Sequence, residues 1–219
     1  SAQYITRGLA TAGFTIVSGL AMGIDAVAHQ TALDTGGKTI AVLGGGVSDQ
    51  KIGPKINLPL SKRILENNGL LISEYSDKEE IYAYNFAIRD RIISGLSKGV
   101  VIVEADRDSG SLITAKCALD QNRDVFAVPG NIFSQKSTGS NNLIKSGAKL
   151  VTSAGDIMDE YGYNLNVFDK SGGNMSTQDP VQKSILAILQ DKGESTSDEI
   201  ISNLTSMGTS DILSSLSVL

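Results

Sequence analysis

Three short turns rich in glycine and serine are the parts of this sequence best suited to bind a ligand. Each follows a strand-like run of apolar residues, and the turns cover 18–23, 44–46 and 108–111. Small residues leave the backbone N–H groups of a turn accessible, and a helix that begins there adds the positive end of its dipole. A phosphate is the ligand that such a turn favours. Three of these turns on one edge of one sheet predict a ligand with several phosphates in a row.

The first turn also has an interpretation without a ligand. Gly19 and Gly23 allow the close backbone approach that a tight strand-to-helix connection needs in any case. The pattern is not GxGxxG, and the sequence contains neither GxxxxGKS nor GxxxxGKT. A dinucleotide or ATP is therefore not specifically indicated.

Aromatic and basic residues alternate between positions 82 and 91. Tyr82, Tyr84 and Phe86 fall on one side if this stretch is extended, and Arg89 and Arg91 follow. Aromatic rings stack on bases and arginines bind phosphates, which is the chemistry of single-strand nucleic-acid binding. Alternatively, the aromatic residues anchor a helix that begins at Phe86, and the arginines are solvated. Composition alone leaves both interpretations open.

The sequence contains little that points to catalysis. Asp25 and His29 lie one helical turn apart, which suits an oriented general base but is more often a structural hydrogen bond. Glu104 ends a predicted strand, where its carboxylate suits a ribose, a metal or neighbouring backbone N–H groups. No nucleophile motif and no metal-binding spacing such as HExxH or CxxC occurs. The single cysteine, Cys117, excludes an internal disulfide and fits a reduced cytoplasmic protein.

The formal net charge of −5 argues at first against a polyanionic ligand. However, two basic and six acidic residues lie from Met175 onward, so residues 1–174 hold 17 basic and 18 acidic residues. A nearly neutral domain binds a polyanion when its cations gather on one rim. No run of 18 apolar residues and no signal peptide occurs, so we expect a cytoplasmic protein with no membrane partner.

The turns must be positioned by strands and helices that alternate along the chain. Continuous Val, Ile and Leu runs indicate strands buried on both faces, as in a parallel sheet covered by helices. We expect strands at 14–18, 38–43, 70–73, 100–104, 124–128 and 148–151, and helices at 2–12, 24–35, 58–67, 86–96, 111–121, 141–146 and 154–161. This order predicts an α/β fold over residues 1–161, a Rossmann-like doubly wound parallel sheet that binds ligands at its C-terminal strand ends. Because the chain opens in mid-helix, we expect the first strand of the sheet to be missing.

A second, smaller unit is expected after a linker. Residues 162–178 are polar and glycine-rich, as linkers are. Residues 179–219 predict three short amphipathic helices: one carries Val181, Ile185, Ile188 and Leu189, and the others are capped by 195–197 and 209–211. Such a unit is similar to the start of a winged-helix module, truncated at Leu219.

Longer motifs, in a fixed order, carry a specific resemblance. They are VSGLAMGID (17–25), TIAVLG (39–44), RIISGLS (91–97), SGSLITA (109–115), VFAVPG (125–130) and GAKLVT (147–152). Together they resemble the DNA-processing protein A family (DprA, also called Smf) over about residues 1–160. The C-terminal unit is similar to the winged-helix-like domain of that family.

The resemblance implies an extended Rossmann fold, a homodimer, no cofactor and no established enzymatic activity. It implies a protein of natural transformation that binds single-stranded DNA, protects incoming DNA and loads the recombinase RecA onto it. It maps the DNA-binding rim onto Gly19, Gly23, Lys55, Phe86, Arg89, Arg91, Ser109, Gly110 and Ser111. On this basis Phe86 stacks on a base, the cations hold phosphates and the turns offer N–H groups.

The sequence departs from the family pattern at four places. The early strand that ends in Gly-Ser-Arg is absent, and loop 47–53 is atypical. Asp90 replaces the usual asparagine between the two arginines, and Ala83 stands where many members have a lysine. We therefore expect weaker DNA binding than in an intact relative.

Two other functions are compatible with the sequence. One is an enzyme acting on a nucleotide or nucleoside phosphate, which needs a nucleophile or acid pair that no motif supplies. The other is a protein-interaction module whose pocket is vestigial. A dimer contact is expected near Leu143, Ile144 and Leu150, apolar residues that ordinary core packing explains as readily.

Overall fold

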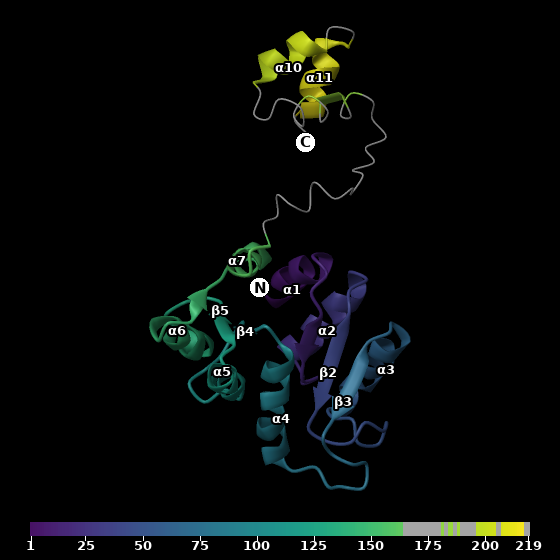
Figure 1. The fold of residues 1–219 in the computed structure, drawn as a ribbon, viewed down its shortest axis with the longest axis vertical. Helices are drawn as coiled ribbons and strands as arrows, with labels where there is room; N and C mark the ends of the chain where they lie inside the picture. Colours follow the sequence, from purple (N-terminus) through teal and green to yellow (C-terminus); the bar gives the residue numbers. More distant parts are fainter. Residues whose placement is uncertain (164–180, 182–183, 186–187, 189–195, 205–206, 217–219) are drawn as a thin grey trace. The chain divides into compact units, whose positions relative to one another are not determined.

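The computed structural model describes residues 1–163, 181, 184–185, 188, 196–204 and 207–216. The chain divides into two compact units, Ser1–Leu165 and Asn166–Leu219 (Figure 1). The division falls within the predicted linker, most of which, at 164–178, lies outside the described residues. Leu189 and Leu219, which we expected in the second unit, also lie outside them.

The first unit contains two parallel sheets of three strands each. One has the order β1 (Ile16–Ser18), β2 (Thr39–Leu43), β3 (Leu70–Ser73), and the other has the order β4 (Gly99–Ile102), β5 (Asp124–Ala127), β6 (Lys149–Leu150). Written one after the other from β3 to β6, these orders match 3-2-1-4-5-6, the doubly wound arrangement of a Rossmann fold. The predicted fold class is thus confirmed. The expectation of a single sheet is wrong, because no hydrogen-bonded pairing links β1 to β4 in the described part of the chain.

Helices cover the sheets at nearly the predicted positions. They are α1 (Ala2–Thr11), α2 (Ile24–Asp34), α3 (Leu58–Glu66), α4 (Ala83–Leu96), α5 (Ser111–Asp120), α6 (Thr138–Lys145) and α7 (Ala154–Glu160), with short 3₁₀ turns η1 (Lys55–Asn57) and η2 (Gln135–Ser137) before α3 and α6. Two helices begin three residues earlier than expected: α4, which has no side-chain cap at Tyr82, and α6. In the described residues, no helix is long and apolar enough to cross a membrane.

The apolar strands form the core, as their composition predicts. Ala41, Val42 and Leu43 of β2 are buried, as are Val125 and Phe126 of β5. Helix α4 packs against α5 and also contacts β1 and β2, so it lies between the two sheets (Figure 1). This placement brings the first turns of α4 and α5 to the C-terminal ends of the strands.

The second unit has a small apolar core of its own. Ile185, Ile200 and Ile212 are buried together. Ile200 belongs to α10 (Ser197–Asn203), Ile212 to α11 (Thr209–Leu216), and Ile185 to the described helical residues 181, 184–185 and 188. Thr196 caps α10 in a capping box with Glu199, which confirms the predicted start of that helix. A winged-helix module stays a prediction.

His29 connects α2 to the sheet through a short chain of hydrogen bonds. Its Nδ1 lies 2.6 Å from Oγ1 of Thr39, which in turn donates to the carbonyl oxygen of Ile16. Since the hydroxyl proton goes to Ile16, Nδ1 is the protonated ring nitrogen, and the buried Nε2 has no partner. Burial lowers the pKa of His29 to about 4, outweighing the opposing effect of Asp25. A neutral, fully buried imidazole is a structural group, so the predicted pairing of His29 with Asp25 forms no general base.

This burial makes folding stability depend on pH. The unfolded chain binds a proton at His29 near pH 6.5, whereas the folded chain does so only at about 4. Stability is therefore fully present above pH 6.5 and falls by up to about 3 kcal/mol as the pH decreases towards 4. Urea unfolding at several pH values measures this, and His29→Asn is expected to remove the decrease. Since His29 is the only histidine, an unchanged pH dependence in His29→Asn would contradict the assignment.

Candidate functional site

The first glycine turn, between β1 and α2, already holds an anion from its own chain. Oδ2 of Asp25 accepts hydrogen bonds from the backbone N–H groups of Gly19, at 3.0 Å, and Ala21, at 3.2 Å. Leu20 between them has a left-handed backbone (φ 58°) and a fully buried side chain, which anchors the turn in the core. The expectation that small residues leave the N–H groups of this turn accessible is therefore wrong for Gly19 and Ala21, because the Asp25 carboxylate already binds them. An acidic residue in the first turn of a helix is the sequence signal for such a contact.

The second turn, 44–46, is buried under another segment and opens no helix directly. A Cβ added to any of these glycines would overlap a side chain of the facing stretch 77–86: Gly44 faces Phe86, Gly45 faces Ile81, and Gly46 faces Asp77. Asp77 also accepts a hydrogen bond from the N–H of Ser48. The triplet is thus a surface for close packing, and α3 starts only at Leu58.

The third turn is open. A Cβ on Gly110 would meet nothing within 4 Å, and α5 begins at the next residue. Ser109 and Ser111 flank it, with their hydroxyl oxygens 2.8 Å apart. Of the three predicted turns, this one has the free helix N-terminus that a phosphate needs.

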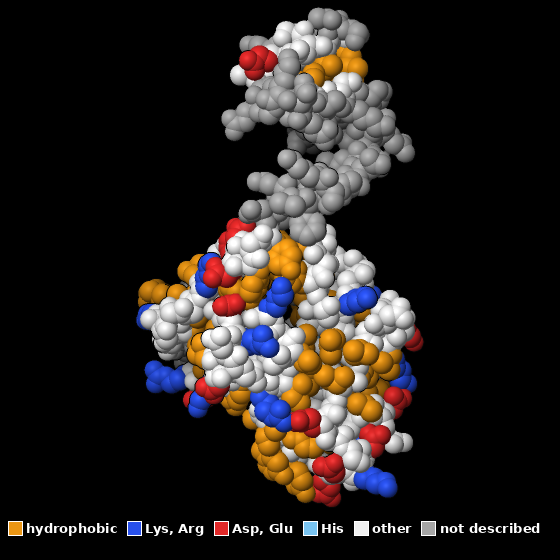
Figure 2. Space-filling model, in the orientation of Figure 1, with side chains coloured by type: hydrophobic (Ala, Val, Ile, Leu, Met, Phe, Trp, Pro, Cys, Tyr) orange, Lys and Arg blue, Asp and Glu red, His pale blue; other side chains and the backbone are white. Residues whose placement is uncertain are grey.

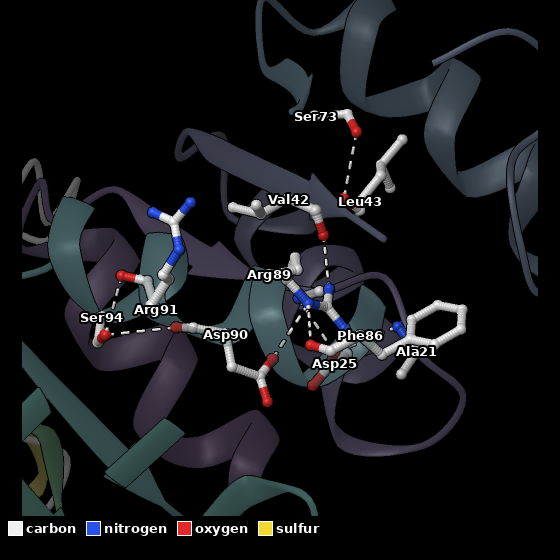
Figure 3. Close-up of polar contacts among 11 residues, drawn as sticks. Ala21, Asp25, Val42, Leu43, Ser73, Phe86, Arg89, Asp90, Arg91 and Ser94 are labelled. Atoms are coloured by element: carbon white, nitrogen blue, oxygen red, sulfur yellow. Dashed lines mark hydrogen bonds and ion pairs between the residues drawn. The ribbon is translucent and has the colours of Figure 1, made fainter. Parts of the chain in front are cut away.

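Helix α4 does not place all the aromatic and basic residues of 82–91 on one side. Because the helix begins at Ala83, Tyr84 and Phe86 point about 200° apart around its axis. The Tyr84 ring stacks on Tyr82, with ring centroids 5.3 Å apart, whereas the Phe86 ring lies over Gly44. The prediction that the three rings share one side is therefore wrong. Figure 3 shows Phe86 and Arg91 pointing away from each other.

Phe86 is held on one side and exposed on the other. Phe86 is 41% exposed although its ring packs directly against Gly44. The guanidinium carbon of Arg89 is 5.9 Å from the ring centroid. The exposed part of the ring is therefore a fixed aromatic surface at the ends of the strands.

Arg89 lies in the interior, although the sequence suggests a rim position. Its side chain is 6% exposed and forms an ion pair with Asp90. Nη1 donates to the carbonyl oxygen of Val42, and Nε donates weakly to that of Phe86 (Figure 3). A Cβ at Gly19 would overlap the guanidinium. A ligand on the surface of the turn reaches this group only if the turn moves.

Asp90 is buried beside Arg89. Burial raises the pKa of its carboxyl, against the effects of Arg89 and of a hydrogen bond from Thr114 in α5. This acidic residue, which replaces the asparagine usual in the resembling family, is thus directed into the α4–α5 contact. It adds less negative charge to the surface than its position in the sequence suggests.

Arg91 and Lys55 are exposed but already bound to groups of the protein. Nη2 of Arg91 lies 2.5 and 2.6 Å from the two carboxylate oxygens of Glu74, both side chains being about half exposed. Nζ of Lys55 donates to the carbonyl oxygens of Asp49 and Gln50. Solvent weakens such contacts, so a phosphate can compete for either cation. Glu74 as the partner of Arg91 was not foreseen from the sequence.

Basic and acidic side chains are interspersed on the face of the first unit shown in Figure 2, and no large field of one sign covers it. In the described part of the chain, no cluster of His, Cys, Asp and Glu can hold a metal ion. Glu104 is exposed beyond the end of β4.

The three residues of the expected dimer contact differ in exposure. Leu150 is 49% exposed on β6, an edge strand of its sheet. Leu143 packs against the core around Val100 and Val125, and Ile144 is half-buried. Only Leu150 of these three presents a clearly exposed apolar side chain.

Sequence comparison relates the chain to proteins of DNA processing. The family model described as DNA recombination-mediator protein A matches residues 1–162. Protein Smf of Escherichia coli (strain K12) is 51% identical over 158 residues, which are 72% of this chain and 42% of that protein. The chain spans about half the length of the curated relatives it matches.

Two solved structures share the fold of the first unit. The X-ray structure of DNA processing protein A from Streptococcus pneumoniae has a TM-score of 0.67 at 45% identity, covering 73% of this chain and 55% of that one. A structure of DNA processing protein A from Helicobacter pylori, which concerns its single-stranded DNA binding mode, has a TM-score of 0.65 at 29% identity. It covers 73% of this chain and 71% of that one.

The role of Asp25 can be tested by unfolding. Asp25→Ala removes the acceptor of two backbone N–H groups and is expected to lower the free energy of unfolding by about 1–2 kcal/mol. Asp25→Asn keeps one side-chain oxygen and is expected to lose less than half of that. Urea unfolding at pH 7 measures both, and equal stability of Asp25→Ala and the unaltered chain would show that the contact contributes nothing.

Proposed function

Because the chain belongs to the DNA recombination-mediator protein A family, we propose that its first unit binds single-stranded DNA at the C-terminal ends of the strands. The observation that carries this proposal is Phe86, a half-exposed residue whose ring packs on Gly44 at the C-terminal ends of the strands. The turn that is open to a phosphate, 109–111, lies at the same end of the strands. An exposed aromatic ring and an anion site at one end of the strands suit a single strand, because it offers both bases and phosphates. The structural similarity to the Helicobacter pylori protein supports the same ligand.

The contacts follow from where each residue lies. Phe86 stacks on a base. The backbone N–H groups of 109–111 and the hydroxyls of Ser109 and Ser111 take one phosphate. Lys55 and Arg91 take others by exchanging their present partners. In the first turn, Gly23 is exposed and belongs to the predicted rim, whereas Gly19 is buried.

The wider role rests on the family resemblance. We propose a cytoplasmic binding protein, without catalysis, that protects DNA and transfers it to the recombinase RecA. We also propose a homodimer. An edge strand with an exposed Leu150 supports a contact at β6, since unpaired strand edges readily pair with another chain.

Titration with fluorescent dT oligomers tests the proposed ligand. Affinity is expected to rise with oligomer length and to fall with salt, with log Kobs decreasing by about 0.7 per phosphate contact for each unit of log salt concentration. Phe86→Ala is expected to weaken binding by about tenfold or more, because one stacked base is lost. Lys38→Ala is the control, since Lys38 precedes β2 at the opposite edge. Binding that depends on neither salt nor length would contradict the proposal.

The ion pair of Arg91 and Glu74 gives a second test. Arg91→Ala is expected to make the salt dependence shallower by about 0.7, the contribution of one phosphate contact to a single strand. Glu74→Gln frees the guanidinium and removes a negative charge, so affinity is expected to rise. An Arg91→Ala chain with unchanged salt dependence would exclude this arginine from the interface.

A further inference from the structure

Arg89 connects three segments that are distant in the sequence. It belongs to α4, its Nη1 donates to Val42 at the end of β2, and its guanidinium fills the space directly beneath Gly19 after β1. With a side chain that is 6% exposed, it cannot exchange these contacts freely with solvent. A buried guanidinium is costly unless its donors are satisfied, so its surroundings must be arranged around it.

Acidic side chains around Arg89 compensate its positive charge. Asp90 forms an ion pair with it at 3.1 Å, and Asp25 is close enough to act on the same group of charges. His29, the other titratable neighbour, is neutral because of its burial. Asp25 accepts hydrogen bonds from the N–H groups of Gly19 and Ala21, and the Arg89 guanidinium packs directly against Gly19, so the turn lies between the two charged groups.

The same guanidinium also fixes Phe86. Nε of Arg89 donates to the carbonyl oxygen of Phe86, one helical turn earlier, at 3.4 Å, and its charge lies 5.9 Å from the ring centroid. The ring packs on Gly44 with the Arg89 guanidinium nearby, and Phe86 remains 41% exposed. We propose that Arg89 is a positioning residue, which holds the Phe86 ring and the Gly19 turn in register for DNA without touching a phosphate. This inference rests on the proposed function and assigns Arg89 a different role from that of Arg91.

The two roles differ in their salt dependence. A cation that binds a phosphate displaces counterions, so its loss makes the salt dependence of single-strand binding shallower by about 0.7. A cation that acts only through Phe86 displaces none. Its loss lowers affinity at every salt concentration equally and weakens base stacking in the complex.

The experiment uses the 219-residue chain and dT oligomers that carry one 2-aminopurine, whose fluorescence is quenched by stacking. Arg89→Met is expected to bind about tenfold more weakly with unchanged salt dependence and less quenching at saturation. The double variant Arg89→Met/Phe86→Ala is expected to bind no more weakly than Phe86→Ala alone, because both changes remove one interaction. Arg91→Ala is the comparison that alters the salt dependence.

Three outcomes would overturn the inference while leaving the proposed function intact. They are a shallower salt dependence in Arg89→Met, additive losses in the double variant, or full quenching in Arg89→Met. A merely structural role would lower the fraction of active protein and leave the quenching of bound oligomer unchanged. An unaltered chain that shows no salt-dependent DNA binding would overturn both the inference and the proposed function.

Gly19→Ala tests the same inference without changing a charge, in case Arg89→Met does not fold. Its Cβ would overlap the guanidinium and displace it. Weaker binding, reduced quenching and unchanged salt dependence are expected. Full affinity with full quenching in a folded Gly19→Ala chain would overturn the inference.

Discussion

A buried guanidinium is the constraint on which the candidate site depends. Arg89 lies where the turn after β1, the end of β2 and the first turns of α4 meet, and its charge is taken up by carbonyl oxygens and by Asp90. Gly19 is glycine because no side chain fits above that group. Since an uncompensated charge in this interior is unfavourable, the three segments keep their mutual positions. The exposed face of Phe86 is a consequence of this arrangement.

The three glycine-rich turns show how one composition serves three physical purposes. The turn after β1 is closed by the Asp25 carboxylate, the triplet after β2 allows side chains of the facing segment to approach, and the turn before α5 stays open. Gly19 and the triplet 44–46 have no room for a Cβ, whereas a Cβ at Gly110 would meet no other group within 4 Å. The chemistry differs because the neighbouring side chains differ. An anion site is therefore a property of a turn together with what covers it.

The charged side chains of the first unit are compensated locally, as the Arg89 guanidinium is. Residues 1–174 are nearly neutral, and exposed cations such as Arg91 have acidic partners nearby. A surface of this kind does not attract a polyanion over long distances. Binding therefore depends on phosphates that replace the present partners of individual cations. The proposed binding of a single strand therefore depends more on the aromatic ring of Phe86 than on net charge.

The sequence by itself determined the order of elements, most of their boundaries and the family. Continuous apolar runs separated by glycine and asparagine leave few alternatives for strands such as 70–73, and ordered motifs identify the family. Only the tertiary structure decided the roles of individual side chains. Arg89 and Arg91 have the same chemistry and are two residues apart, yet one is buried and the other exposed. Helix α4 (Ala83–Leu96) buries one of these arginines and exposes the other because of the way it packs against β1, β2 and α5. Local helix propensity does not decide which face of the helix is buried.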